Sequence, residues 1–149
     1  MTEIDEIASD FEFLEDWEQR YQYLTELGEA LPAMPESEKI DANRVKACMS
    51  KVWVRAHWDT QKPNTIYFNG DCDTAIIKGV VALLVQLFSG KTPETILAMD
   101  VDGLFERLQL AENLSPNRHV GVYAIVDVMK GQVEMLLAGR DQAKPSELG

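Results

Sequence analysis

A single cysteine within a short basic segment is the residue with the clearest chemical potential. Cys48 is flanked on both sides by cationic side chains, namely Arg44, Lys46, Lys51 and Arg55. The chain as a whole is acidic, with a formal net charge of -11. Neighbouring cations favour the thiolate, which is the nucleophilic form of cysteine. We therefore predict that Cys48 is a reactive thiol.

Two further residues could take part in that chemistry. Cys72 lies near the start of a predicted helix, whose N-terminus would lower the pKa of its thiol, but a packed structural thiol is the favoured interpretation. Cys72 could also be a resolving thiol for Cys48, provided that their Cα atoms lie within about 7 Å. His57 could pair with Cys48 as a base, but a surface imidazole is the favoured interpretation.

The cysteine and histidine content argues against a metal centre. The chain contains two of each, and His57 and His119 have no recognised ligand spacing with the cysteines. We predict no bound metal and no resident cofactor. An iron–sulfur scaffold is disfavoured as well, because such clusters are usually held by four thiolates. Two cysteines are too few for a disulfide framework, so we expect both to be reduced.

Charge and hydropathy restrict the partners. Residues 1–40 contain twelve acidic and two basic side chains. This balance disfavours nucleic acid, which needs a basic surface, and suits a basic patch on a protein partner. No segment approaches the roughly 18 apolar residues of a membrane span, and residues 1–10 lack the features of a signal peptide. We therefore expect a cytoplasmic protein that does not bind membranes.

The elements that precede Cys48 in the sequence are predicted to be helical. Apolar residues recur at helical spacing from 4 to 14 and from 17 to 27, which predicts two amphipathic helices or one bent helix. Asp16 is a candidate N-cap and Gly28 a candidate C-cap. Pro32 and Pro35 cannot continue a helix, so an irregular segment leads toward Cys48.

The segment after Cys48 is predicted to be a β-hairpin. Residues 52–58 alternate with a period of two and are rich in β-branched and aromatic side chains. Residues 65–69 form a second predicted strand, and residues 59–64, which include Pro63, form the turn. A third strand of the sheet is predicted within residues 44–50, where the alternation of apolar and polar residues is ambiguous. Cys48 would then lie on a loop or edge just before the hairpin.

Helices are predicted to complete the domain. Residues 76–88 are apolar nearly all round, which indicates a central helix, with Asp71 or Asp73 as its N-cap. Further helices are predicted from Thr92-Pro93, over residues 104–108 and from Ser115-Pro116. The order predicts an α+β fold in which helices cover one side of a small antiparallel sheet. We expect one domain over residues 1–138 and a disordered tail over 139–149.

A series of short motifs between residues 16 and 130 goes beyond these local patterns. It comprises Asp16 to Tyr21 with Leu27-Gly28 and Leu31-Pro32, Asn43 to Cys48 with Ser50, Val52 and Trp53, Gly70-Asp71 with Asp73, Ala75 and Ile76, Lys78-Gly79, Thr92-Pro93-Glu94, Leu114-Ser115-Pro116, Arg118 and Gly121. Together these motifs resemble the SufE/CsdE family of sulfur acceptors. Their shared order and spacing argue against chance similarity.

The resemblance implies a SufE-like fold and a role in iron–sulfur cluster assembly. It implies that Cys48 takes sulfane sulfur from the persulfide of a cysteine desulfurase, activates that enzyme, and passes the sulfur to a scaffold or another acceptor. The chain would be a sulfur-transfer partner rather than an enzyme, with pyridoxal phosphate belonging to the desulfurase. Candidate supporting residues are Arg118, which matches a family arginine, together with Asp73 and Lys51.

Three positions depart from the family pattern. Ala47 replaces a usual glycine, Met49 a usual Gln or Thr, and Cys72 a usual serine. Ala47 narrows the backbone freedom of the loop, so loop geometry and partner preference depend on these positions. The alternative function is a thiol-dependent hydrolase or redox enzyme that uses Cys48 and His57. The sequence lacks a nucleophile motif for that alternative.

Overall fold

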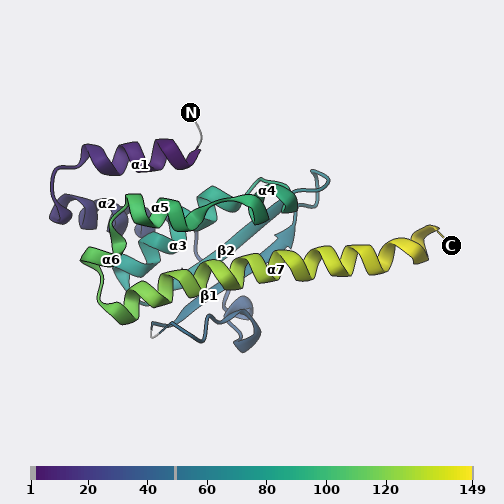
Figure 1. Ribbon diagram of the computed structural model, residues 1–149. Helices are drawn as coiled ribbons and strands as arrows, with labels where there is room; N and C mark the ends of the chain where they lie inside the picture. Colours follow the sequence, from purple (N-terminus) through teal and green to yellow (C-terminus); the bar gives the residue numbers. More distant parts are fainter. Residues whose placement is uncertain (1–2, 49, 149) are drawn as a thin grey trace.

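The α+β fold is confirmed in the computed structural model, which describes residues 3–48 and 50–148 (Figure 1). A two-stranded sheet lies among helices, and the last helix is the longest element. In chain order the elements are α1 Glu3–Phe13, α2 Trp17–Ala30, the 3-10 helices η1 Glu36–Glu38 and η2 Asp41–Asn43, β1 Val52–Trp58, β2 Ile66–Cys72, α3 Ala75–Phe88, α4 Pro93–Ala98, α5 Val101–Arg107, α6 Leu110–Asn113 and α7 Pro116–Leu148.

The predicted hairpin is confirmed, but the third strand is wrong. β1 and β2 pair antiparallel from Val52 opposite Cys72 to Trp58 opposite Ile66. In the described part of residues 44–50 the chain makes one isolated bridge, from Arg44 to Trp53. It then turns back, because the N–H of Cys48 donates to the carbonyl of Val45 at 3.3 Å. A chain that turns after one rung cannot extend a strand.

β2 is longer than the sequence predicts and continues through Gly70, Asp71 and Cys72. Gly70 lies against α3, where an added Cβ would come within 2.7 Å of a Val81 methyl group. Asp71 lies within β2, and Asp73 lies between β2 and the residue that precedes α3. Neither is the N-cap of α3, contrary to our prediction. That position is Thr74, whose side chain makes no capping hydrogen bond.

α2 and α3 cross at two glycines. A Cβ on Gly28 would lie 2.9 Å from the backbone nitrogen of Gly79, and a Cβ on Gly79 would overlap the backbone of Leu24. Because α2 continues past Gly28 to Ala30, Gly28 is not its C-cap, contrary to our prediction. The buried helix α3 is central to the core, as predicted.

Local start signals predict several helix boundaries correctly. The Asp16 carboxylate accepts from the Gln19 N–H at 2.9 Å and begins α2. The Thr92 hydroxyl accepts from the Thr95 N–H at 3.2 Å and begins α4, with Pro93 in its first turn. Such caps act within one turn, so the local sequence is enough to predict them.

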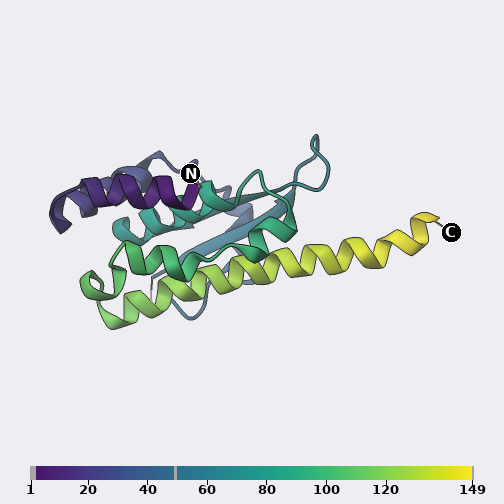
Figure 2. The same ribbon diagram turned by 45° about the horizontal axis from the view of Figure 1, so that its top comes forward.

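α7 runs beside β1 along the length of the sheet, and its C-terminal end projects past the other elements (Figure 1, Figure 2). The Gln132 amide covers the free edge of β1: its oxygen accepts from the Ala56 N–H and its nitrogen donates to the Val54 carbonyl, both at 2.8 Å. Arg140 Nη1 donates a hydrogen bond to Asn64 Oδ1 at 2.6 Å. Residue 140 thus still contacts the hairpin, and α7 continues to Leu148; disorder of the tail stays a prediction.

Candidate functional site

Cys48 lies on a short loop whose two ends are joined. The N–H of Val45 donates to the carbonyl of Val52 at 2.9 Å, where the loop enters β1. Within the loop, the N–H of Cys48 donates to the Val45 carbonyl at 3.3 Å. The backbone therefore closes a hairpin-like turn that presents residues 46–48 beside the end of the sheet.

The turn between β2 and α3 fastens the other limb of this loop. Lys51 and Asp73 exchange two hydrogen bonds, one from the Lys51 N–H to Asp73 Oδ1 at 3.0 Å and one from the Asp73 N–H to the Lys51 carbonyl at 3.1 Å. The Ser50 and Thr74 hydroxyls share a hydrogen bond of 2.8 Å. Lys51 and Asp73, both predicted as supporting residues, thus meet through their backbones and one carboxylate.

The Cys48 side chain is buried, with 6% of its surface exposed. Its sulfur lies against Gly121 in the first part of α7, where a Cβ would approach Cys48 Sγ to 2.8 Å. Only glycine leaves room for the thiol at this contact. Val120, which precedes Gly121 in α7, is 59% exposed.

Two of the four cations that flank Cys48 in the sequence, Lys46 and Arg55, bind carboxylates in the structure. Lys46 Nζ lies 2.7 Å from an Asp41 carboxylate oxygen, and Arg55 Nη1 lies 3.5 Å from Glu38. The charges of these two residues are therefore partly neutralised. Lys51 is exposed, and its fixed contribution to the site comes from its backbone.

Cys72 is also a buried free thiol. The pKa of Cys72 is raised to about 11, chiefly by burial; a hydrogen bond from the Thr74 N–H opposes the rise, and the charges of Asp73, Cys48 and Asp71 contribute to it. A helix N-terminus therefore does not lower the pKa of Cys72, and the burial of its side chain agrees with the favoured interpretation of a packed thiol. Cys72 lies in β2, ahead of the helix, and desolvation outweighs the nearby N–H.

A charged network on the outer face of the hairpin holds the segment before the loop. Lys39 Nζ lies 2.8 Å from Asp71 Oδ2 and over the Trp53 ring, 5.7 Å from its centroid. Burial alone would raise the pKa of Asp71, but hydrogen bonds from Lys39 and the Cys72 N–H, with the Lys78 charge, lower it. The sequence motif contains Asp71, but its contact with Lys39 depends on a loop that no periodicity predicts.

His57 is not brought to Cys48 by the strand. Alternation along β1 places His57 on the face of Trp53 and Arg55, opposite the buried Val52 and Val54. Cys48 packs in the same buried cluster as these two valines. The Cys/His arrangement needed by the alternative thiol enzyme is therefore unsupported.

Two predicted features fall outside what the structure describes. Arg118 belongs to the first turns of α7, but its side chain is not among the described ones. Met49 lies outside the described residues. Ala47, the other departure beside Cys48, is described and exposed.

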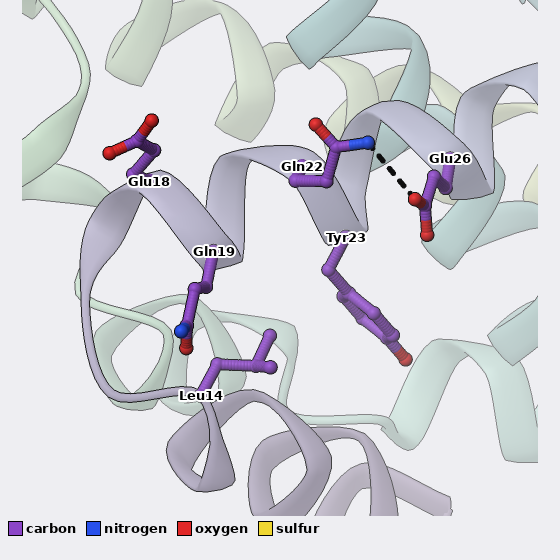
Figure 3. Close-up of a pocket in the computed structure, with 6 residues that line it drawn as sticks. All are labelled: Leu14, Glu18, Gln19, Gln22, Tyr23 and Glu26. Atoms are coloured by element: carbon purple, nitrogen blue, oxygen red, sulfur yellow. Dashed lines mark hydrogen bonds between the residues drawn. The ribbon is translucent and has the colours of Figure 1, made fainter.

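A hollow of 460 Å³ lies elsewhere, at the start of α2 (Figure 3). Its lining residues are Leu14, Glu18, Gln19, Gln22, Tyr23 and Glu26. None of them belongs to the Cys48 loop, β2 or α7. Within the described residues, His, Cys, Asp and Glu form no group of three that could hold a metal ion. Among the described residues, the site at Cys48 consists of the thiol, the backbone hydrogen bonds of its loop and the contact with Gly121.

Comparisons with known proteins show the family and support the fold. The model of the SufE family, described as an Fe-S metabolism associated domain, matches residues 5–133. The chain belongs to the SufE family. Its family is associated with iron–sulfur metabolism, and the matched range includes every residue of the Cys48 loop.

The alignments of this SufE protein with its relatives cover nearly the whole length of both chains. An uncharacterized SufE-like protein of Rhizobium etli is 38% identical over 139 residues, covering 93% of this chain and 94% of the relative. One of Rhizobium meliloti is 38% identical over 136 residues, covering 90% and 96%. The solution structure of a hypothetical protein from Thermus thermophilus has a TM-score of 0.74 at 23% identity, covering 91% and 96%, which supports the fold.

The described helices also bear on membrane contact. None is both long and apolar enough to cross a bilayer. Even α7, which has the length, carries charged side chains along its course.

Proposed function

We propose that the chain is a sulfur carrier that accepts sulfane sulfur from the persulfide of a cysteine desulfurase onto Cys48, activates that enzyme, and passes the sulfur on for iron–sulfur cluster assembly. The observation that carries this proposal is a free thiol on a closed loop, buried against Gly121, in a chain of the SufE family. Iron–sulfur metabolism needs a source of sulfur, and a carrier thiol is a chemically sufficient means of moving it.

The transfer is an exchange reaction at divalent sulfur. The Cys48 thiolate attacks the outer sulfur of the donor persulfide, the donor thiolate leaves, and Cys48 becomes the persulfide. A second attack, by the next acceptor, returns Cys48 to a thiol. No metal or cofactor of this chain is needed in either step.

Burial of Cys48 fits the requirements of a carrier. A persulfide that is open to solvent reacts with any passing thiol, so a carrier benefits from covering it between partners. Docking of the desulfurase would then have to uncover the thiol. The loop is suited to such a movement, since its outermost residues Lys46 and Ala47 are exposed while its two ends are fixed.

The test is to mix the purified chain with a cysteine desulfurase and free cysteine, trap the thiols by alkylation, and analyse the products by mass spectrometry. We expect one added sulfur on Cys48 and an increase in desulfurase turnover. Cys48→Ser should abolish both, whereas Cys72→Ser is the matched control that should keep them. Absence of added sulfur on Cys48 would contradict the proposal.

A further inference from the structure

The chain carries a second buried thiol that the proposed function does not use. Cys72 ends β2, and its backbone is part of the structure that fastens the Cys48 loop. We propose that Cys72 is a resolving thiol, which discharges a persulfide on Cys48 that no acceptor has taken, forming a Cys48–Cys72 disulfide and releasing hydrosulfide. This inference rests on the proposed persulfide at Cys48.

Strand pairing places Cys72 at the base of the Cys48 loop. Cys72 is the register partner of Val52, the residue at which the loop joins β1. The next rung joins Lys51 to Asp73 by hydrogen bonds of 3.0 and 3.1 Å. Consecutive links therefore hold the limb of the loop that follows Cys48 against the turn that follows Cys72.

Both thiols are also buried in the core. Burial is the main reason why the pKa of Cys72 rises to about 11, but negative charge on Cys48 contributes to the rise. Cys48 and Cys72 each have 6% of their surface exposed and belong to one buried cluster.

The reaction balances without an external oxidant. The Cys72 sulfur forms a bond to Cys48 Sγ, and the bond from Cys48 Sγ to the outer sulfur breaks. The outer sulfur leaves with that electron pair as hydrosulfide, and it takes the proton of the Cys72 thiol. The outer sulfur is thereby reduced, and the Cys72 thiol and Cys48 are left oxidised as a disulfide.

The surroundings of Cys72 suit a reserve thiol. Its raised pKa keeps it protonated, so it competes weakly with an incoming acceptor and holds the proton that the leaving sulfur requires. We assign the attack to the inner sulfur, because the loop backbone and Gly121 hold Cys48 Sγ in place. Attack on the outer sulfur would instead move it to Cys72.

The test loads the full chain with inorganic polysulfide, so that it does not depend on a desulfurase. After desalting, persulfide loss, sulfide release and non-reduced peptide masses are followed in the wild type, Cys72→Ser and Cys72→Ala. Cys48→Ser confirms that the sulfur is lost from Cys48, and circular dichroism confirms that each variant is folded.

We expect the wild type to release one sulfide per persulfide and to accumulate a peptide cross-linked between Cys48 and Cys72. Both Cys72 variants should keep the persulfide several-fold longer and form no such peptide. Equal lifetimes in all three proteins, or sulfur recovered on Cys72 itself, would overturn the inference. Failure of a desulfurase to load Cys48, while polysulfide loads it and the decay is as expected, would contradict the proposed function alone.

Discussion

At the scale of the residue, Cys48 is placed by one contact within its own loop and by contacts from two distant parts of the chain. The Val45 carbonyl accepts a hydrogen bond from the Cys48 N–H. Asp73 accepts a hydrogen bond from the Lys51 N–H, in the part of the loop after Cys48, and Gly121 leaves room for the Cys48 sulfur. The thiol therefore owes its shelter to backbone hydrogen bonds and to one missing Cβ.

Gly121→Ala should push the thiol out of its place. The added Cβ would lie 2.8 Å from Cys48 Sγ, which is too close for either atom to stay. We expect a loss of stability of about 1–3 kcal/mol, as for other overpacked sites, and faster alkylation of Cys48 by a thiol reagent. The measurements are urea unfolding and the alkylation rate of the isolated protein.

Gly131→Ala is the matched control in the same helix. A Cβ at this position meets no atom within 4 Å. It should stabilise α7 by about 0.5–1 kcal/mol, since alanine is the better helix former, and leave the alkylation rate unchanged. If Gly121→Ala behaved like Gly131→Ala, the contact between Gly121 and Cys48 would have no role in covering the thiol.

At the scale of the element, the exposed edge of β1 is closed by a side chain rather than by a strand. The Gln132 amide makes the two hydrogen bonds, to Val54 and Ala56, that a third strand would make there. An uncovered edge is a site for pairing with another chain. Gln132 therefore joins α7 to the sheet and also protects the hairpin.

Gln132→Ala should destabilise the protein by about 1–3 kcal/mol, because the Val54 carbonyl and the Ala56 N–H lose their partner. The substitution should also promote self-association, which light scattering would detect both during urea unfolding and in buffer without urea. Met135→Ala, at a side chain that is 74% exposed in the same helix, is the comparison and should change neither. An unfolding curve for Gln132→Ala that matches the wild type would show that water replaces the amide at no cost.

Elements were predictable where their signals are local. Asp16 and Thr92 cap helices through residues in the next turn, and the period of two in β1 is visible along the strand. Gly28 and Gln132 were not predictable, because their roles come from helices and strands far away in the sequence. For the site, the sequence predicts Cys48, but its cover by Gly121 requires the fold.

At the scale of the whole molecule, the family match ends close to Arg140, which makes the last of the described side-chain contacts of α7. The family model matches through residue 133, and Arg140 makes contacts with Asn64 and over the Trp58 ring. The C-terminal end of α7 then extends beyond the other elements (Figure 2). The acidic charge predicted to suit a basic partner is concentrated at the opposite end of the chain, in residues 1–40.

Removal of residues 141–149 should change the free energy of unfolding by no more than about 0.5 kcal/mol, because it leaves the packed body intact. Sulfur loading of Cys48 should be unchanged. Arg140→Ala, in contrast, should cost about 1 kcal/mol through its lost hydrogen bond and cation–π contact. Thermal unfolding of both proteins is the measurement, and a large loss on truncation would show that the tail packs on the body.

The contact between Cys48 and Gly121 also has a consequence for synthesis. Chains emerge from the ribosome N-terminus first, at about 5–20 residues per second. The Cys48 thiol is therefore made several seconds before the helix that covers it, and until α7 arrives it is open to any electrophile in its surroundings. The same delay means that a nascent chain has no shelter yet for the sulfur that we propose Cys48 carries.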